Sequence, residues 1–206
     1  MKITQVVELS KTRSKVYIEQ EFAFVLCKGE LRLNRIKEDE EIGEDTYNTI
    51  MKEVLPKRAK LRAMNLLMSR EYTTAQLRTK LRQGFYPDVV IQEALDYVAS
   101  FHYTDDLRYA EDYITSHEAT RSRKRIEQDL MNKGVSKETI EKAWAVWEEK
   151  GGSQDEIAMI NSLLEKKNYN PEEADYKEQQ KIFAFLLRKG FSAEQIRRAM
   201  HTDFDI

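Results

Sequence analysis

The sequence predicts a mainly α-helical protein, a tandem array of three three-helix repeats forming an elongated curved molecule, with a small N-terminal β-hairpin or ribbon. Three observations predict this fold. The start of the chain alternates apolar and polar residues as strands do, the chain after Gly29 follows a helical period, and one pattern of apolar residues recurs three times. Because each short unit buries only a small core, we expect neighbouring units to stack on one another.

The strand-like segment runs from Ile3 to Leu26. Its apolar runs lie at residues 4–9, 15–19 and 22–25, and the polar residues 10–14 separate the first two runs as a hairpin loop would. A ribbon of two or three strands is only marginally stable by itself. We therefore expect this segment to pack against the helices that follow it.

The helical part repeats one apolar spacing, with successive steps of four, ten, three and one residues. Each ten-residue step contains a glycine turn, at residues 84–87, 134–136 and 190–192. Glycine readily takes the left-handed conformation that ends a helix, so each copy predicts a helix, a tight turn and a second helix. In the first copy the glycine lies one residue early, and Pro87 or Asp88 is expected to begin the next helix. The matching apolar positions are Leu77, Leu81, Ile91, Ala94 and Leu95, then Ile126, Leu130, Ile140, Ala143 and Trp144, then Ile182, Leu186, Ile196, Ala199 and Met200.

One more helical stretch precedes each pair, at residues 59–69, 105–118 and 153–167. Thr73, Ser153 and Ser192 are each followed three residues later by Gln or Glu, which is the pattern of a capping box at a helix start. The predicted domains are an N-terminal β-ribbon with a helical extension at residues 1–56, followed by three-helix repeats at residues 57–102, 103–152 and 153–206.

The residue types that usually carry catalysis or bind metals form no recognisable constellation in the sequence. The three histidines are scattered without cysteine partners, and the seven glycines never form a phosphate-binding loop, so we expect no metal, no cofactor and no small-molecule substrate. Adjacent residues on a helix point about 100° apart, so Asp105 and Asp106 are interpreted as a helix start rather than as a catalytic pair. The chain is therefore predicted not to be an enzyme.

The sequence also indicates a compartment. Cys27 is the only cysteine, which excludes an intramolecular disulfide and favours a reducing environment. The start of the sequence lacks an apolar run of signal-peptide length, and no window approaches the roughly 20 apolar residues of a membrane span. We expect a cytoplasmic protein with no membrane partner.

Basic residues are concentrated in three blocks, which indicates binding to a polyanion or an acidic partner. Between residues 57 and 82, eight Lys and Arg residues are opposed only by Glu71, and members one helical turn apart are expected to form a positive plate on two antiparallel helices. The sequence contains no recognisable base-reading element, so contacts to nucleic acid are expected to be with phosphate and independent of base sequence. The candidate binding residues are Lys57, Arg58, Lys60, Arg62, Arg70, Arg78, Lys80 and Arg82, then Arg121, Arg123, Lys124 and Arg125, then Arg188, Lys189, Arg197 and Arg198.

Several short motifs follow one another in order between residue 57 and the carboxyl end. They are Ala63 and Leu67 with Arg70; Gln76-Leu77-Arg78 with Lys80-Leu81; His102-Tyr103-Thr104-Asp105-Asp106 with Arg108-Tyr109-Ala110; Arg125-Ile126-Glu127-Gln128-Asp129-Leu130 with Lys133-Gly134-Val135; and Phe185-Leu186-Leu187-Arg188-Lys189-Gly190-Phe191. Together, on a three-unit helical array, these motifs resemble the RecX family, the bacterial regulators of the RecA recombinase. The strand-rich start is similar to the extension of members from Gram-positive bacteria. The basic stretch at residues 120–125 is shorter than the family's and lacks Gly, and Thr104 stands where the family has Leu.

The resemblance implies a non-enzymatic regulator that lodges in the helical groove of the RecA filament on DNA and bridges its protomers. It would inhibit ATP hydrolysis, strand exchange, the SOS response and recombinational repair. The implied partners are the RecA filament and, through phosphate contacts, single-stranded and duplex DNA. Two alternatives stay open from the residues alone: a stand-alone helical DNA-binding protein of helix-turn-helix type, and a peptide-binding helical scaffold with no role in nucleic-acid binding.

Overall fold

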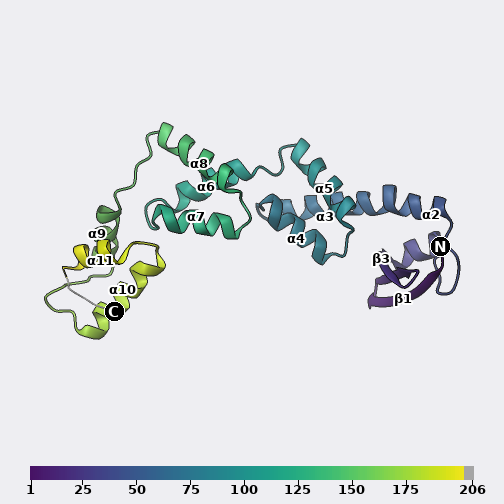
Figure 1. Cartoon of the computed structure of the whole chain (residues 1–206), viewed down its shortest axis with the longest axis horizontal. Helices are drawn as coiled ribbons and strands as arrows, with labels where there is room; N and C mark the ends of the chain where they lie inside the picture. The colour runs from purple at the N-terminus through teal and green to yellow at the C-terminus, as the bar shows by residue number, and fades with distance from the viewer. Residues whose placement is uncertain (202–206) are drawn as a thin grey trace. The chain divides into compact units, whose positions relative to one another are not determined.

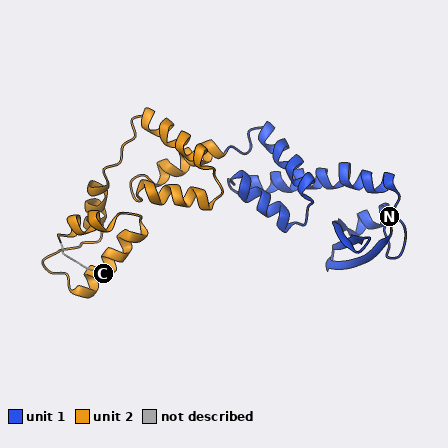
Figure 2. Ribbon diagram, in the orientation of Figure 1, with its two compact units in different colours: residues 1–105 blue, residues 106–206 orange. Residues whose placement is uncertain are grey.

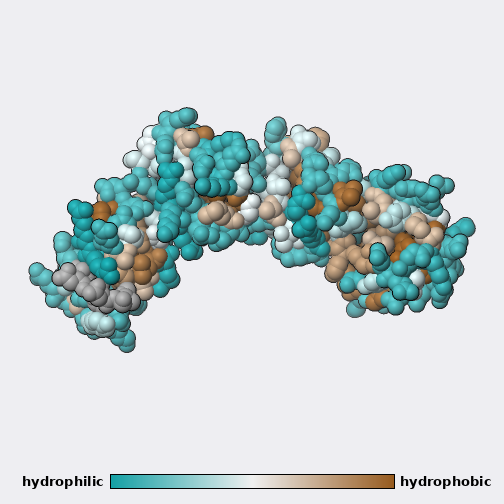
Figure 3. Space-filling view, in the orientation of Figure 1, coloured by the Kyte–Doolittle hydropathy of each residue, from teal (hydrophilic) through white to brown (hydrophobic). Residues whose placement is uncertain are grey.

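The computed structural model describes residues 1–201, and the chain divides into two compact units, residues 1–105 and residues 106–206 (Figures 1 and 2). The chain is mainly helical with a small antiparallel sheet at its start, as the sequence predicts. The predicted third repeat extends to residue 206, and its last positions, 202–206, lie outside the described residues. No helix within residues 1–201 is both long and apolar enough to cross a lipid bilayer. The face drawn in Figure 3 is largely hydrophilic, with apolar side chains in scattered patches.

The N-terminal ribbon is a three-stranded antiparallel sheet in the order β1-β2-β3. A two-residue turn joins the first two strands, so the loop is shorter than the predicted one at residues 10–14. Glu19 and Gln20 between the second and third strands both have positive φ, of 51° and 71°, which is the geometry of a tight hairpin turn that matches the twist of the strands. The strands are β1 (Ile3–Ser10), β2 (Arg13–Ile18) and β3 (Glu21–Cys27).

The sheet packs against the first repeat rather than standing apart from it. Alternate residues of the strands, among them Val16, Phe24 and Leu26, are buried in the same hydrophobic core as the helices of the first unit. Outside that core, the Phe22 ring contacts the Phe85 ring edge to face, with centroids 6.3 Å apart. The N-terminal extension and the first repeat therefore share one core.

The helices of the first unit begin directly after β3. Residues 44–69 form one uninterrupted helix that contains a π-helical segment at residues 50–54. In that segment the Leu55 N–H donates to the Ile50 carbonyl five residues earlier. Pro56 follows at once; it has no N–H to donate, and the wider π turn accommodates its ring. The helix thus runs through the predicted domain boundary at residues 56/57, and the division into four segments stays a prediction. The helices are α1 (Lys28–Leu33), α2 (Glu44–Thr49), η1 (Ile50–Val54), α3 (Leu55–Ser69), α4 (Thr74–Gln83) and α5 (Asp88–Ser100).

The second unit holds two further helix triplets, each around its own core. The apolar positions of the threefold pattern are buried in all three triplets, except that Ala199 is only partly buried. The repeated spacing places these apolar residues on one side of each helix, and that side packs against the other helices of the same triplet. The helices are α6 (Asp106–His117), α7 (Arg123–Asn132) and α8 (Lys137–Glu149), then α9 (Glu156–Lys166), α10 (Tyr176–Arg188) and α11 (Ala193–Met200).

The glycine turns follow the prediction in two copies and differ in the first. Gly134 and Gly190 have φ of 84° and 95°, in the left-handed region that glycine tolerates. In the first copy Phe85 takes that conformation, with φ of 64°, while Gly84 stays right-handed. Pro87 is the N-cap of α5, one of the two predicted positions.

Two of the three predicted capping boxes are present. The side chains of Thr73 and Ser192 each accept the backbone N–H three residues on, and their own backbone N–H donates to the side chain of that Gln residue. The prediction at Ser153 is wrong, because α9 begins at Glu156 and its N-cap is Asp155, which accepts the Ala158 N–H at 3.0 Å. The residues before Asp155 belong instead to the segment that joins α8 to α9.

Candidate functional site

Four of the eight residues of the first basic block form hydrogen bonds or ion pairs within the protein, so only part of the block is left for the positive plate that the sequence predicts. Arg58 turns toward the sheet, where its guanidinium donates to the Glu30 carboxylate at 2.8 Å and to the Val25 carbonyl at 3.1 Å. The Arg58 side chain is only 20% exposed. Its charge is therefore used to hold the sheet against α3.

Three more members of this block bind α5. Lys60 pairs with Glu93 at 2.7 Å, Arg78 donates to the Gln92 side chain at 2.6 Å, and the Arg82 Nε donates to Asp88 at 2.9 Å. The hydrogen bond from Arg82, with its positive charge, lowers the pKa of the exposed Asp88 carboxyl. These contacts join α3 and α4 to α5 and leave less positive charge for a partner than the sequence indicates.

The remaining members are more accessible. Lys57 and Arg62 are exposed, Lys80 is partly exposed, and none of the three has an ion pair within residues 1–201. The Arg70 guanidinium lies 4.4 Å from the centroid of the Tyr72 ring. These four residues are the members of the first block that form no ion pair or hydrogen bond with another side chain in the described chain.

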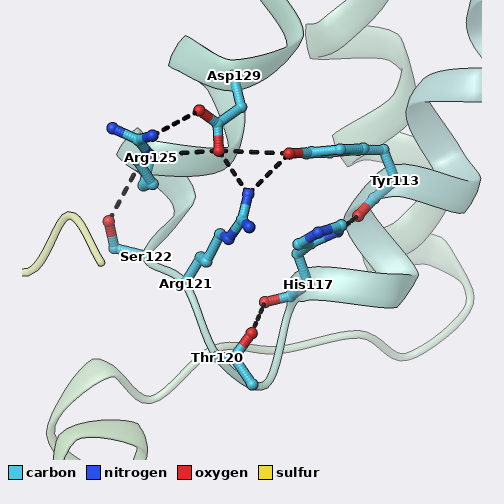
Figure 4. Close-up of polar contacts among 7 residues, drawn as sticks. All are labelled: Tyr113, His117, Thr120, Arg121, Ser122, Arg125 and Asp129. Carbon is cyan, nitrogen blue, oxygen red and sulfur yellow. Dashed lines mark hydrogen bonds and ion pairs between the residues drawn. The ribbon is translucent and has the colours of Figure 1, made fainter. Parts of the chain in front are cut away.

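The second block is organised around Asp129, whose side chain is 11% exposed (Figure 4). Arg121 donates to one carboxylate oxygen at 2.6 Å, and Arg125 bonds to both oxygens at 3.2 and 3.0 Å. The Tyr113 hydroxyl donates to Asp129 at 3.3 Å and accepts from Arg121 at 2.7 Å. One carboxylate thus holds two arginines and a phenol, and we name this arrangement the Asp129 clasp.

The aromatic side of the clasp lies along α6. The Tyr113 ring stacks on His117 with centroids 4.1 Å apart, and the His117 ring nitrogen contacts the Tyr113 carbonyl at 2.8 Å. Burial raises the pKa of the Tyr113 hydroxyl, and the negative charge of Asp129 adds to the effect. Tyr113 is therefore both a packing residue and a polar partner of Arg121 and Asp129.

Arg123 and Lys124 are not part of the Asp129 clasp. Arg123 donates to Glu127 at 3.0 Å and to Glu148 at 2.7 Å, and its guanidinium lies 4.6 Å from the Trp144 ring centroid. Lys124 is exposed, and no ion pair engages it in the described chain. Both residues lie in the first turn of α7, where positive side chains oppose the helix dipole. At Arg123 the ion pairs with Glu127 and Glu148 offset this repulsion, whereas Lys124 has no such partner in the described chain.

The second and third repeats meet at the clasp. The Ser122 N–H donates to the Lys189 carbonyl at 3.1 Å, and a Cβ built on Gly190 would overlap the Arg125 Cβ. The Gln154 side chain donates to the carbonyls of Glu118 and Arg121 at 2.7 and 3.1 Å. The basic loop is thus fixed by backbone contacts with the third repeat.

The third block combines two exposed arginines with two cations that lie near aromatic rings. Arg188 and Arg198 are exposed, whereas Arg197 lies 5.9 Å from the Phe183 ring centroid and Lys189 lies 5.6 Å from that of Phe185. The sequence interpretation missed three lysines that lie near Arg188, at positions 167, 177 and 181, on a groove of about 520 Å³. The sequence does contain a signal for this arrangement, because Lys177, Lys181 and Phe185 follow one another at steps of four residues and so lie on one side of α10.

No group of three or more His, Cys, Asp or Glu residues within the described part of the chain is arranged to hold a metal ion. The carboxylate oxygens of the clasp are already engaged by two guanidinium groups and the Tyr113 hydroxyl. The chemistry that these sites offer is anion binding by guanidinium and ammonium groups.

Comparison with known proteins agrees with this architecture. Sequence models of the first, second and third three-helix domains of RecX match residues 59–97, 105–143 and 154–200. A regulatory protein RecX of Caldanaerobacter subterraneus subsp. tengcongensis is 30% identical over 203 residues, which cover 98% of this chain and 99% of that protein. One from Clostridium perfringens strain SM101 is 31% identical, over 87% of this chain and 84% of its own.

Two solved structures share the fold. The crystal structure of a regulatory protein RecX aligns with a TM-score of 0.58 at 21% identity, over 98% of this chain and 99% of that one. RecX from Lactobacillus salivarius aligns with a TM-score of 0.56 at 24% identity, over 72% and 96%. With three helix triplets matched in order and similarity along nearly the whole chain, this protein belongs to the RecX family of regulatory proteins.

Proposed function

We propose that the chain binds the RecA–DNA filament and inhibits its ATP hydrolysis and strand exchange, and so restrains the SOS response and recombinational repair. The observation that carries this proposal is the match of all three helix triplets, in order, to the three domains of RecX. The proposal includes no catalytic step. The protein would act by binding alone and without a cofactor, from the cytoplasm.

The distribution of charge supports an electrostatic contribution to this binding. Side chains of all three blocks remain exposed and without ion pairs in the described chain, among them Arg62, Lys124, Arg188 and Arg198. Such side chains can neutralise DNA phosphates or acidic protein surface, and counterion release then makes the affinity depend steeply on salt. The ion-paired arginines would contribute less, because a partner must first compete with a carboxylate of this chain.

The direct test is the DNA-dependent ATPase of RecA on single-stranded DNA, measured with and without substoichiometric amounts of this protein. We expect the rate to fall at ratios well below one protein per RecA protomer, since a protein that bridges protomers affects more than one of them. An unchanged rate at a ratio of one to one would reject the proposal. Tight, sequence-selective binding to duplex DNA in the absence of RecA, measured by gel shift against random competitor, would favour the helix-turn-helix alternative.

The electrostatic part has a separate test with a matched pair of variants. Arg62→Gln removes an exposed charge, and we expect weaker filament binding with a log–log salt slope that is smaller by up to about 0.9 for each phosphate that is no longer neutralised. Arg58→Gln removes a charge that already pairs with Glu30, so it should lower stability and change the salt slope little. Equal salt slopes in wild type and Arg62→Gln would exclude Arg62 from the interface.

A further inference from the structure

The third repeat contains a groove with a more specific chemistry than a positive surface. The groove lies between the end of α9 and one side of α10 and has a volume of about 520 Å³. Lys177, Lys181, Phe185 and Arg188 follow one another along α10 at steps of four, four and three residues, so the helical period brings them to the same side. Lys167, from the end of α9, faces them across the groove.

Four cations and two carboxylates, Asp175 and Glu178, line this groove, so an excess of positive charge remains. None of its four cations forms an ion pair within residues 1–201, unlike the arginines at 58 and 121. Of the two carboxylates, Asp175 is engaged as the N-cap of α10, where it accepts the Glu178 N–H at 2.7 Å. Like charges four residues apart, as at Lys177 and Lys181, repel each other. An anionic ligand would relieve that repulsion.

Phe185 gives the groove an aromatic surface among these cations. Its ring is partly buried against the core of the third repeat, so its position is fixed. The ammonium groups of Lys167 and Lys189 lie 5.1 and 5.6 Å from the ring centroid, within the range of cation–π attraction. Aromatic rings beside cations are the combination that binds single-stranded nucleic acid, in which a base stacks on the ring and the cations contact the phosphates. At Phe185 the flexible lysine side chains would move off the ring as the base stacks on it.

We propose that this groove binds a short stretch of single-stranded nucleic acid, with one base stacked on Phe185 and the neighbouring phosphates held by Lys177, Lys181 and Arg188. In a duplex each base is already stacked between its neighbours, so only phosphates can reach the groove. A preference for single strands over duplex follows. The inference rests on the proposed function in that it assigns one nucleic-acid contact of the same regulator, but it can be tested without RecA.

The test is fluorescence anisotropy of the full chain with a labelled oligothymidylate of about 12 nucleotides, and with a duplex of the same length. Phe185→Leu keeps an apolar side chain against the core and removes the stacking surface. We expect it to weaken single-strand binding about 5- to 100-fold, the range for loss of one stacked base, and to leave duplex binding within about twofold. Phe101→Leu, at an aromatic residue that is 55% exposed and lies outside the groove, is the control and should change neither affinity.

The lysines provide a second, independent readout. Lys181→Gln should lower the log–log salt slope for the single strand by up to about 0.7, the value for one phosphate of a single strand. Lys142→Gln, an exposed lysine paired with Glu138 on α8, should leave the slope unchanged. Thermal unfolding monitored by circular dichroism verifies that each variant is folded.

Equal single-strand affinity in Phe185→Leu and wild type would overturn the inference, as would a reduction of the same size for single strand and duplex. Absence of oligothymidylate binding by the wild type at low salt would also overturn it. RecA ATPase distinguishes this failure from failure of the proposed function. If the wild type suppresses the ATPase and Phe185→Leu binds single strands normally, only the groove assignment is wrong. If the wild type does not suppress the ATPase, the proposed function fails whatever Phe185 does.

Discussion

At the scale of single residues, Asp129 is the most heavily engaged side chain of the second basic block. Asp129→Asn removes the charge that holds Arg121 and Arg125, and we expect the free energy of unfolding to fall by about 2 kcal/mol, because charge-assisted bonds of a mostly buried carboxylate are removed. Urea unfolding measures this decrease. Glu127→Gln, whose pair with Arg123 is exposed on both sides, is the control and should cost less than about 0.5 kcal/mol.

Asp129→Asn also distinguishes the effect of Asp129 on stability from its effect on DNA binding. With the carboxylate neutralised, two arginines become available to a partner, so affinity of Asp129→Asn for DNA at low salt should rise while stability falls. A fall in both quantities would indicate that the geometry of the clasp, rather than its net charge, matters for binding.

The Tyr113 hydroxyl carries a pH dependence. Burial, with the charge of Asp129, raises its pKa above 10.0, so the folded chain keeps the phenolic proton at a pH where the unfolded chain loses it. The stabilisation is therefore complete below pH 10 and is lost as pH rises through the pKa of the folded state. Unfolding by urea at several pH values should show a smaller alkaline loss in Tyr113→Phe than in wild type. The loss should not vanish, because burial raises the pKa of Tyr169 in the same direction.

At the scale of elements, the turn before α11 joins two repeats as well as two helices. Gly190 has φ of 95°, and a Cβ there would overlap the Arg125 Cβ and lie 2.5 Å from the Ser122 Oγ. We expect Gly190→Ala to lower the free energy of unfolding by about 2 to 4 kcal/mol, since left-handed strain adds to overpacking. Differential scanning calorimetry is a suitable measurement.

Gly151 is the matched control for this substitution. It has φ of 88°, but a Cβ there would contact nothing within 4 Å, so Gly151→Ala should cost only the conformational part, about 1 kcal/mol. Equal decreases at the two glycines would show that the contact between the second and third repeats contributes no stability.

At the scale of the whole molecule, the separate cores predict separate unfolding of the two compact units. Both tryptophans, Trp144 and Trp147, lie in the second unit, so tryptophan fluorescence reports that unit while far-ultraviolet circular dichroism reports both. Phe24 is fully buried in the core shared by the sheet and the first repeat, and Phe24→Ala should cost that unit about 3 to 5 kcal/mol. We expect an earlier transition in circular dichroism with an unchanged fluorescence transition.

The converse variant completes the experiment. Leu130→Ala, in the core of the second repeat, should lower the fluorescence transition and leave the first unit unchanged. A fluorescence transition that shifts equally in Phe24→Ala would show instead that the units unfold together.

Helices, strands and the threefold pattern could be predicted from the amino-acid sequence alone. Those features depend on neighbours within about one helical turn or one hairpin, such as the glycine at 134 or the capping box at Thr73, and local interactions of this kind are visible as spacing. The failure at Ser153 has the same origin, because the local pattern permits a cap there while contacts of Gln154 with the second repeat hold that segment outside the helix.

Which basic residues remain available to a partner depends on how distant parts of the chain pack together. The sequence predicts positive blocks by counting, but the partner of Arg58 lies 28 residues away, at Glu30, and the groove around Phe185 needs Lys167 from another helix. Charges interact through space, so the pairing of a side chain depends on how distant segments pack, which composition and periodicity do not specify. Packing thus turned part of the predicted binding surface into structural ion pairs and brought Lys167 beside the lysines of α10.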